Sequence, residues 1–447
     1  MRVLPWAVSV LTILLILIWP IPHTITLRDV LILLLGGVLG YLVATGRVVV
    51  KPPRGLRIPL YVCLALILWM VIVAVVLSNE TAWSLGELAG QWGMGLLTLV
   101  LGAVTGMWLQ ESGQSQAAFL TMIFTVLIAF VIYLDLYGLW EFVNTGEIPT
   151  RIGGLEESLD KASLDVWLAG SFLMTEIVAR LTTKNRFLRI NNIVLAVLVI
   201  AVLFGSYLAA SRNGMVVLFL LMILSGAAYV MAVHPVSRKR VFILLAGIVI
   251  VVPLLVTVLV RVDDRWQTFM QTIPIALDTK HNRNWLEFDK PLPTLPDGRP
   301  VEDSNYKRIA WLKEGIVLVL ERPLGRGFGR QIFGHALKEK YAVEKPETHP
   351  HSGLLGLAIG AGIPGALLWI AFCIFLIRFG YKEFRQTKSY APLALLLLTT
   401  GFAVATTLDS MMQDHMLQEF MFLAGLLAVL SATKAIETRS ARAARHQ

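Results

Sequence analysis

The chain has 447 residues, of which 56% are hydrophobic and only 15% are charged, and its formal net charge is +9. Soluble domains carry about 25% charged residues, so this composition excludes an ordinary soluble enzyme and the disordered and fibrous classes. Apolar runs of about 20 residues recur along the chain, each long enough to cross a bilayer as a helix, and they lack the alternation of a membrane β-barrel. We therefore expect an all-α polytopic membrane protein whose excess positive charge reflects topology and not a nucleic-acid partner.

About twelve transmembrane helices are predicted. The first follows Arg2, as in a signal peptide, but Trp19-Pro20-Ile21-Pro22 offers no small-residue cleavage site, so this span is expected to be retained. The predicted spans are 4–21, 29–46, 57–77, 90–109, 117–140, 163–181, 189–209, 213–233, 240–260, 352–377, 390–409 and 415–433.

The distribution of Lys and Arg orients these spans. The termini and the connections on their side carry 20 Lys and Arg residues, whereas the short connections on the other side carry only Arg28, Arg151, Lys161 and Arg212. Because positive residues remain on the cytoplasmic side, both termini are expected to be cytoplasmic. The expected division is nine helices in 1–260, a loop on the outer face at 261–351, three helices in 352–433 and a basic cytoplasmic tail at 434–447.

The loop at 261–351 is predicted to be partly helical. Ile309, Leu312, Ile316 and Leu320 recur at helical spacing, and Arg322-Pro323-Leu324-Gly325 is expected to end that helix. Loops of this length are usually functional or disordered, and an internal amphipathic helix favours function. The glycines of 325–329 follow no predicted strand and precede no Gly-Lys-Ser sequence, so they indicate a turn and not a nucleotide site.

Charged residues within the spans are few. Asp135, Asp165 and Glu176 are the candidates, and a functional and a structural role are equally open for each of them. Cys63 and Cys373 both lie in apolar runs, so neither a disulfide framework nor a thiolate metal site is expected.

Arginines near the outer interface are the first candidate binding residues. Arg212, Arg265 and Arg308 lie where the positive-inside rule disfavours them, and a bound anion would offset that cost. The guanidinium fork matches phosphate oxygens, so a phosphorylated or pyrophosphorylated lipid headgroup is the expected ligand. The alternatives are that Arg212 reaches outer-leaflet phosphates and that Arg265 pairs with the neighbouring Asp263 and Asp264.

His349 and His351 are the candidate catalytic residues. A zinc site needs three or four ligands, and no further His or Cys lies at a suitable local spacing, so no metal is predicted. A histidine titrates near neutrality and can take a proton from a hydroxyl, so a general base fits better. A satisfied structural histidine at the interface is the alternative.

Taken in order, these elements resemble a known family. The pieces are Ser211-Arg212-Asn213-Gly214, Arg308-Ile309-Ala310-Trp311, Glu321-Arg322-Pro323-Leu324-Gly325-Arg326-Gly327-Phe328-Gly329, His349-Pro350-His351-Ser352-Gly353-Leu354-Leu355 and Gly360-Ala361-Gly362-Ile363-Pro364-Gly365. Their order and spacing resemble the O-antigen ligase and polymerase superfamily of bacterial inner-membrane glycan-transfer proteins. Asn213 and Ser352 differ from the residues usual in the family at those positions.

The resemblance implies a GT-C-like glycosyltransferase of the bacterial inner membrane, with the loop at 261–351 and the active site in the periplasm. In the ligase branch it implies transfer of O-antigen polysaccharide from undecaprenyl pyrophosphate to a sugar of lipid A-core, which completes lipopolysaccharide. It implies donor contacts for Arg212, Arg308 and, on a looser local pattern, Arg265, and a catalytic role for His351 with His349 beside it. Such a donor is already activated, so arginines and a histidine suffice for a metal-independent, inverting transfer without a cofactor.

Other functions remain open at this stage. An O-antigen polymerase would share the donor site, and a protein O-glycan ligase would use a protein acceptor. A transporter or flippase would also suit twelve spans, but such proteins place their polar residues at the membrane centre, whereas here they gather on one face.

Overall fold

The structure is a computed structural model that describes residues 3–149, 151–156, 158–182, 186–232, 268–286 and 290–445. Within these ranges every element is helical, apart from one isolated β-bridge between Thr294 and Pro300. The predicted all-α polytopic fold is therefore confirmed. The predicted span at 240–260 and the candidate residue Arg265 lie outside the described residues.

Ten helical stretches of the described chain are long and apolar enough to cross a membrane. They comprise α2 (Ile25–Ala44), the stretch Arg54–Leu77 around α3 (Arg57–Ile72), the stretch Thr81–Glu111 formed by α4 (Thr81–Leu88), a π-helical turn and α5 (Met94–Glu111), α6 (Gln116–Thr145), α7 (Leu159–Thr182), α8 (Asn192–Ala209), α9 (Arg212–Ala232), α14 (Gly353–Thr387), α15 (Tyr390–Leu408) and the apolar part of α16 (Asp414–Arg445). The first predicted span corresponds to the shorter α1 (Val3–Ile18). Eleven of the twelve predicted spans thus have a counterpart.

The second span begins earlier than predicted, which corrects the place of Arg28. This residue was expected in a connection, but it lies inside α2 and is buried. Its Nη2 donates to the carbonyl of Ile21 at 2.8 Å and its Nε donates to Thr24 Oγ1 at 3.1 Å. The helix tolerates this charged side chain because its N–H groups find acceptors in the preceding turn, the carbonyl of Ile21 and the hydroxyl of Thr24.

Close helix packing holds the centre of the bundle together. On α5, a Cβ atom at Gly102 would lie 2.0 Å from the carbonyl oxygen of Phe422, and on α16 a Cβ at Gly425 would lie 2.3 Å from that of Leu99. Glycine at both crossings lets the two backbones touch, which is how membrane helices gain contact where lipid offers no hydrophobic driving force.

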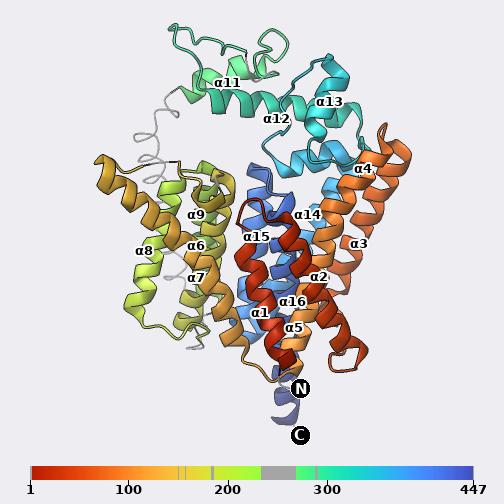
Figure 1. Cartoon of the computed structure of the whole chain (residues 1–447), viewed down its shortest axis with the longest axis vertical. Coiled ribbons are helices and arrows are strands. Elements are labelled where there is room, and N and C mark those ends of the chain that lie inside the picture. Colours follow the sequence, from red (N-terminus) through yellow and green to blue (C-terminus); the bar gives the residue numbers. More distant parts are fainter. Residues whose placement is uncertain are drawn as a thin grey trace.

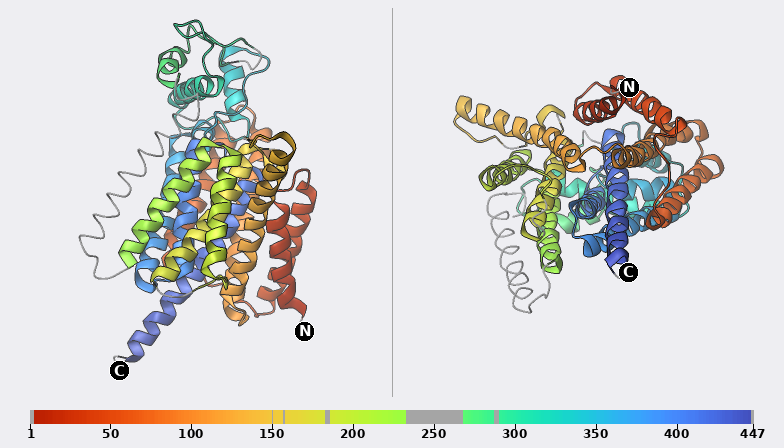
Figure 2. Two further views of the ribbon diagram at one scale, coloured as in Figure 1. Left: turned by 90° about the vertical axis from the view of Figure 1, so that its left-hand side faces the viewer. Right: turned by 90° about the horizontal axis from the view of Figure 1, so that it is seen from below.

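The two chain termini lie at one end of the bundle, and α11 (Phe269–Leu277), α12 (Asp303–Glu321) and α13 (Ile332–Tyr341) cover the opposite end (Figures 1 and 2). We call these the terminal end and the loop end. The helices of the long loop therefore lie at the opposite end of the bundle from both termini (Figures 1 and 2).

The amphipathic helix predicted in the loop is present as α12, and it ends at Glu321, directly before the predicted Arg322-Pro323 stop. The apolar stripe that revealed it is not its buried face, since Leu312 is 51% exposed and Ile316 48%. The helix instead buries Tyr306 and Trp311, because a neighbouring face carries the larger aromatic side chains that pack in the separate core of the loop.

The loop is fastened to the bundle beside α14. The predicted turn lies slightly earlier, at 323–324, and the segment 325–329 after it is irregular. The amides of Arg326 and Gly327 donate to the carbonyl of Gly360 at 3.0 and 3.1 Å. That carbonyl precedes a kink of α14 at Gly362, whose φ is +70°, a conformation favourable only to glycine. A Cβ at Gly362 would also lie 2.3 Å from the backbone of Leu324. This close approach positions the α12–α13 connection over the bundle.

Candidate active site

Four separate parts of the chain meet at the loop end of the bundle. They are the start of α9 with Arg212, the first turns of α12 with Arg308, the residues before α14 with His351, and the connection between α15 and α16 with Asp409. Three of these residues were predicted site residues. Asp409 was not, and it lies near His351 and Arg308 and bonds to Asn213, the neighbour of Arg212.

His351 is held by an aromatic ring and a carboxylate. Its imidazole stacks on Trp311, with the ring centroids 5.1 Å apart and the planes at 15°. Its Nδ1 lies 3.6 Å from Asp409 Oδ1, close enough for electrostatic attraction although longer than a direct hydrogen bond. The backbone φ of His351 is +48°, which is costly for a residue with a Cβ, and strained residues of this kind cluster at functional sites. The side chain remains 32% exposed, so a substrate can reach it.

Asp409 is a buried carboxylate with a well-defined set of partners. Its side chain is 0% exposed, Asn213 Nδ2 donates to Oδ2 at 2.9 Å, and the amide of Ser410 donates to Oδ1 at 2.9 Å. Burial opposes ionisation, but the neighbouring His351 imidazole and the Arg308 guanidinium, 3.8 Å away, hold the pKa of the Asp409 carboxyl well below its usual range. The carboxylate is therefore charged, and it lies beside the His351 imidazole.

The two described arginines stand at the boundary between the bundle and the loop. Arg212 Nη1 donates to Asn305 Oδ1 at 2.7 Å and its Nη2 donates to Ser304 Oγ at 3.2 Å, both in the first turn of α12. Arg308 lies one turn further along the same helix and is 33% exposed. The Arg212 guanidinium is thus held against the first turn of α12, where the helix dipole adds further positive potential for an anion.

His349 lies apart from the His351–Asp409 pair. It lines a polar cavity together with Arg330 and Gln413. Burial, and then the neighbouring His351, lower the pKa of His349 below its ordinary value. At neutral pH its imidazole is therefore uncharged and can accept or donate one hydrogen bond to a polar ligand.

Sequence reasoning missed Asp409, Asp160 and Asn213. Each lies at or just before the boundary of a predicted span, where polar residues are expected in any membrane protein. The only available signal was an acidic residue in a short outer connection with no Lys or Arg next to it, which holds for Asp409 between Leu408 and Ser410. Glu176, by contrast, has a structural role, because its carboxylate accepts from Arg180 Nε at 2.6 Å and from the amides of Phe187 and Leu188 at 3.0 and 3.2 Å.

Side chains of the types that bind metal do meet here. Asp160, His351 and Asp409 place ligand atoms within 4.8 Å of one another, a set that distance in sequence concealed. The chemistry of the surroundings disfavours a cation, since the Arg308 guanidinium already lies 3.8 Å from Asp409 and like charges repel at this range. The neighbouring arginines make the site better suited to an anion.

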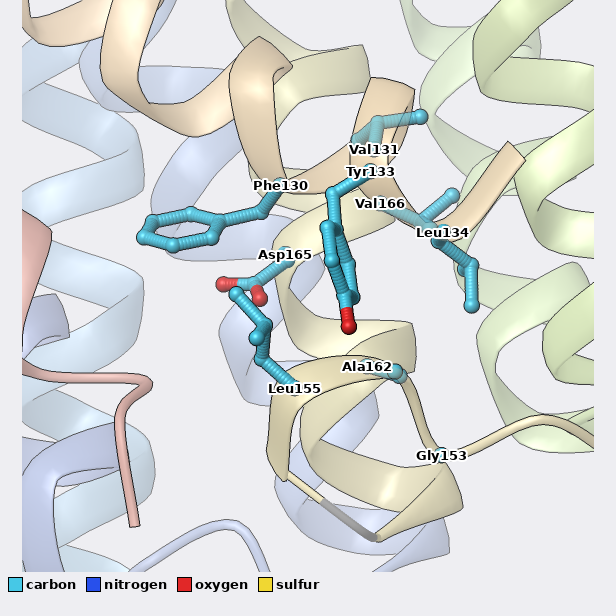
Figure 3. Close-up of a pocket in the computed structure, with 10 residues that line it drawn as sticks. Phe130, Val131, Tyr133, Leu134, Gly153, Leu155, Ala162, Asp165 and Val166 are labelled. Carbon is cyan, nitrogen blue, oxygen red and sulfur yellow. The ribbon is translucent and has the colours of Figure 1, made fainter. Parts of the chain in front are cut away.

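A second hollow at the loop end, between α6 and α7, is too small for a substrate. Asp165, Tyr133 and Phe130 face it together with apolar neighbours (Figure 3). Its free volume of about 10 Å³ would hold at most one water molecule.

Part of the chain matches a known family. Residues 195–370 match the family model described as O-Antigen ligase, a stretch that includes Arg212, Arg308, His349 and His351. No curated protein matches the chain.

Proposed function

The match over residues 195–370 supports membership of the O-antigen ligase superfamily, and from that premise we propose that this membrane protein is an O-antigen ligase. It transfers O-antigen polysaccharide from undecaprenyl pyrophosphate to a sugar hydroxyl of lipid A-core. The family supports glycan transfer of the ligase or polymerase type in general. The donor, the acceptor and the residue roles below are our proposal.

The contact between His351 and the buried, charged Asp409 is the observation that carries the proposal. Since Nδ1 of His351 faces Asp409, Nε2 is the nitrogen that takes the proton from the acceptor hydroxyl. Asp409 stabilises the imidazolium that results, and the stacked Trp311 fixes the plane of the ring. The base is therefore oriented before the substrate arrives.

Arg212 and Arg308 bind the pyrophosphate of the donor, with Arg265 as a further expected ligand. The acceptor oxygen attacks the anomeric carbon while the bond from that carbon to the phosphate oxygen breaks, and the electron pair leaves on undecaprenyl pyrophosphate. Charge develops on the leaving pyrophosphate, where preorganised guanidinium donors lower the barrier without a cation. Nothing in this step needs a cofactor.

Direct attack inverts the anomeric configuration. We expected inversion from the sequence because no carboxylate could be placed there to form a covalent glycosyl intermediate. The structure corrects that reason, since Asp160 and Asp409 both lie beside His351. Asp409 is fully buried and bonded to Asn213, so it is poorly placed to reach a sugar carbon. Inversion therefore remains our prediction, and retention would implicate Asp160.

Reconstituted transfer tests this function. The purified protein in liposomes, given undecaprenyl-pyrophosphate-linked glycan and purified lipid A-core, should form glycan-extended lipid A-core equally well with and without a chelator, because the proposed mechanism uses no cation. Gel mobility and NMR of the new linkage report yield and configuration. Elongated lipid-linked glycan with no product on lipid A-core would indicate a polymerase instead, and loss of activity in the chelator would contradict the metal-free mechanism.

We further propose that the protein lies in the bacterial inner membrane with the loop end in the periplasm. Cys63 and Cys373 are both buried, so new cysteines report selectively. Asp297→Cys in the loop should react with a membrane-impermeant maleimide in cells with a permeabilised outer membrane. Lys51→Cys at the terminal end is the matched control and should react only after the inner membrane is breached. The reverse pattern would place the site in the cytoplasm and overturn the proposed donor and acceptor.

A further inference from the structure

A polar cavity of about 330 Å³ opens at the loop end beside His349. Its lining residues include Trp83, Glu87, Arg330, His349, Gln413 and Asp414. The volume falls within the range of small-molecule sites, which begins near 300 Å³. Most such sites are mainly apolar, whereas this one is lined chiefly by hydrogen-bonding side chains. A polar ligand therefore fits it better than an apolar one.

Three separate elements build the cavity around Arg330. From the segment before α13, the Nε and Nη2 of Arg330 donate to the two carboxylate oxygens of Glu87 on α4, at 3.0 and 3.2 Å. Its Nη1 donates to Asp414 Oδ1 at the start of α16, at 3.1 Å. The amide of Asp414 in turn donates to Gln91 Oε1 at 2.6 Å. Because the guanidinium is hydrogen-bonded to carboxylates on two sides, its orientation is fixed before any ligand binds.

The charge of this cavity differs from that of the arginine site. Two carboxylates accompany one guanidinium, and the pKa of His349 is lowered, so the lining carries no excess positive charge. A pyrophosphate would meet repulsion here. A sugar would not, because its hydroxyl groups can donate to carboxylates and accept from guanidinium and amide N–H groups.

The cavity also borders the catalytic segment. A second, smaller pocket shares Arg330, His349 and Gln413 with it and is lined in addition by Pro350 and Ser352, the two neighbours of His351 in the chain. Among the described residues, the lining of these pockets includes neither Arg212 nor Arg308. The segment from His349 to Ser352 therefore borders the polar cavity through His349, while its His351 lies beside Asp409.

We propose that this polar cavity is the subsite for the acceptor saccharide. Glu87, Asp414 and Arg330 bind hydroxyl groups of the sugar that receives the glycan, and His349 and Gln413 guide the attacking hydroxyl toward His351. The inference rests on the proposed function and adds to it the residues that select the acceptor. It also explains how donor and acceptor reach the base from different sides, as an inverting displacement requires.

The test compares the KM for the acceptor with the KM for the donor in a variant that neutralises one charge of the cavity. Glu87→Gln keeps the shape of the side chain but removes a charged acceptor, so the KM for lipid A-core should rise about tenfold or more, while the KM for the lipid-linked donor stays unchanged. Asp297→Asn is the matched control, because it neutralises another arginine-paired carboxylate of the same end, bonded to Arg299 at 2.7 Å and remote from the cavity. It should leave both constants at the wild-type values.

A second variant and a binding measurement distinguish loss of acceptor binding from misfolding of the Glu87→Gln protein. Gln413→Ala removes a lining amide without breaking the Arg330 clamp and should also raise the KM for lipid A-core. Calorimetry with the oligosaccharide released from lipid A-core, in the absence of donor, should show weaker binding to both variants than to the wild type.

The possible outcomes separate the two proposals. Wild-type protein that neither binds this oligosaccharide nor transfers glycan to lipid A-core would overturn the proposed function and the subsite together. Wild-type transfer with unchanged acceptor constants in both variants would overturn the subsite alone. A rise confined to the donor KM would show that the cavity holds the donor glycan instead.

Discussion

Replacing His351 with alanine should slow glycan transfer by about 10²–10⁴-fold, the usual contribution of a positioned general base, and leave donor binding intact. The reason is the proton: without the imidazole, the acceptor hydroxyl must attack while still protonated or lose its proton to water. Single-turnover transfer from a labelled donor to lipid A-core measures the rate, and donor binding is measured on the same preparation without acceptor.

The choice of histidine is tested by two further variants. His281→Ala removes a histidine of the loop that is exposed and paired only with Asp278 in the described contacts, and it should leave the rate unchanged. His349→Ala should act mainly through the acceptor, because His349 faces the polar cavity and not Asp409. A near-normal His351→Ala protein beside an inactive His349→Ala protein would mean that we have assigned the wrong base.

Replacing Arg212 with alanine should lower kcat/KM by roughly 10–150-fold, which corresponds to about 1.5–3 kcal/mol of charge-assisted hydrogen bonding in the transition state. Arg212→Lys should recover only part of this loss, because it keeps the charge but not the planar fork. The kcat/KM values for the lipid-linked donor in liposomes provide the measurement.

Arg212 also bonds to Asn305 and Ser304, so its replacement could loosen the contact of α12 with the bundle. A thermal-stability measurement separates that effect from loss of the donor contact. Arg299→Ala is the control, since it removes an exposed arginine of the loop. If Arg212→Ala protein of normal stability transfers glycan at the wild-type rate, Arg212 is not a donor ligand.

Local pattern was enough to predict the helices. Apolar runs of bilayer length identify membrane spans because backbone polar groups in lipid must be satisfied within the segment, which makes the helix the only local solution. The same holds for α12, whose repeat and stop signal are local properties of 309–325. The pattern misled at Arg28, whose partners lie in the preceding turn, and at the exposed stripe of α12, where packing in the core of the loop selected another face.

The arginines and histidines of the site could be suspected from residue type and interface position, but their relation to one another could not. Asp409 contacts His351 and Arg308 only because α15 ends where α14 and α12 begin, and Glu87, Arg330 and Asp414 come from three different parts of the chain. Hydropathy determines which segments enter the membrane, but not which helices become neighbours or how far each helix is shifted along the membrane normal. Packing decides both, through close approaches such as Gly102 against Phe422. It thereby brings polar residues that are distant in the sequence together at one site and around one cavity.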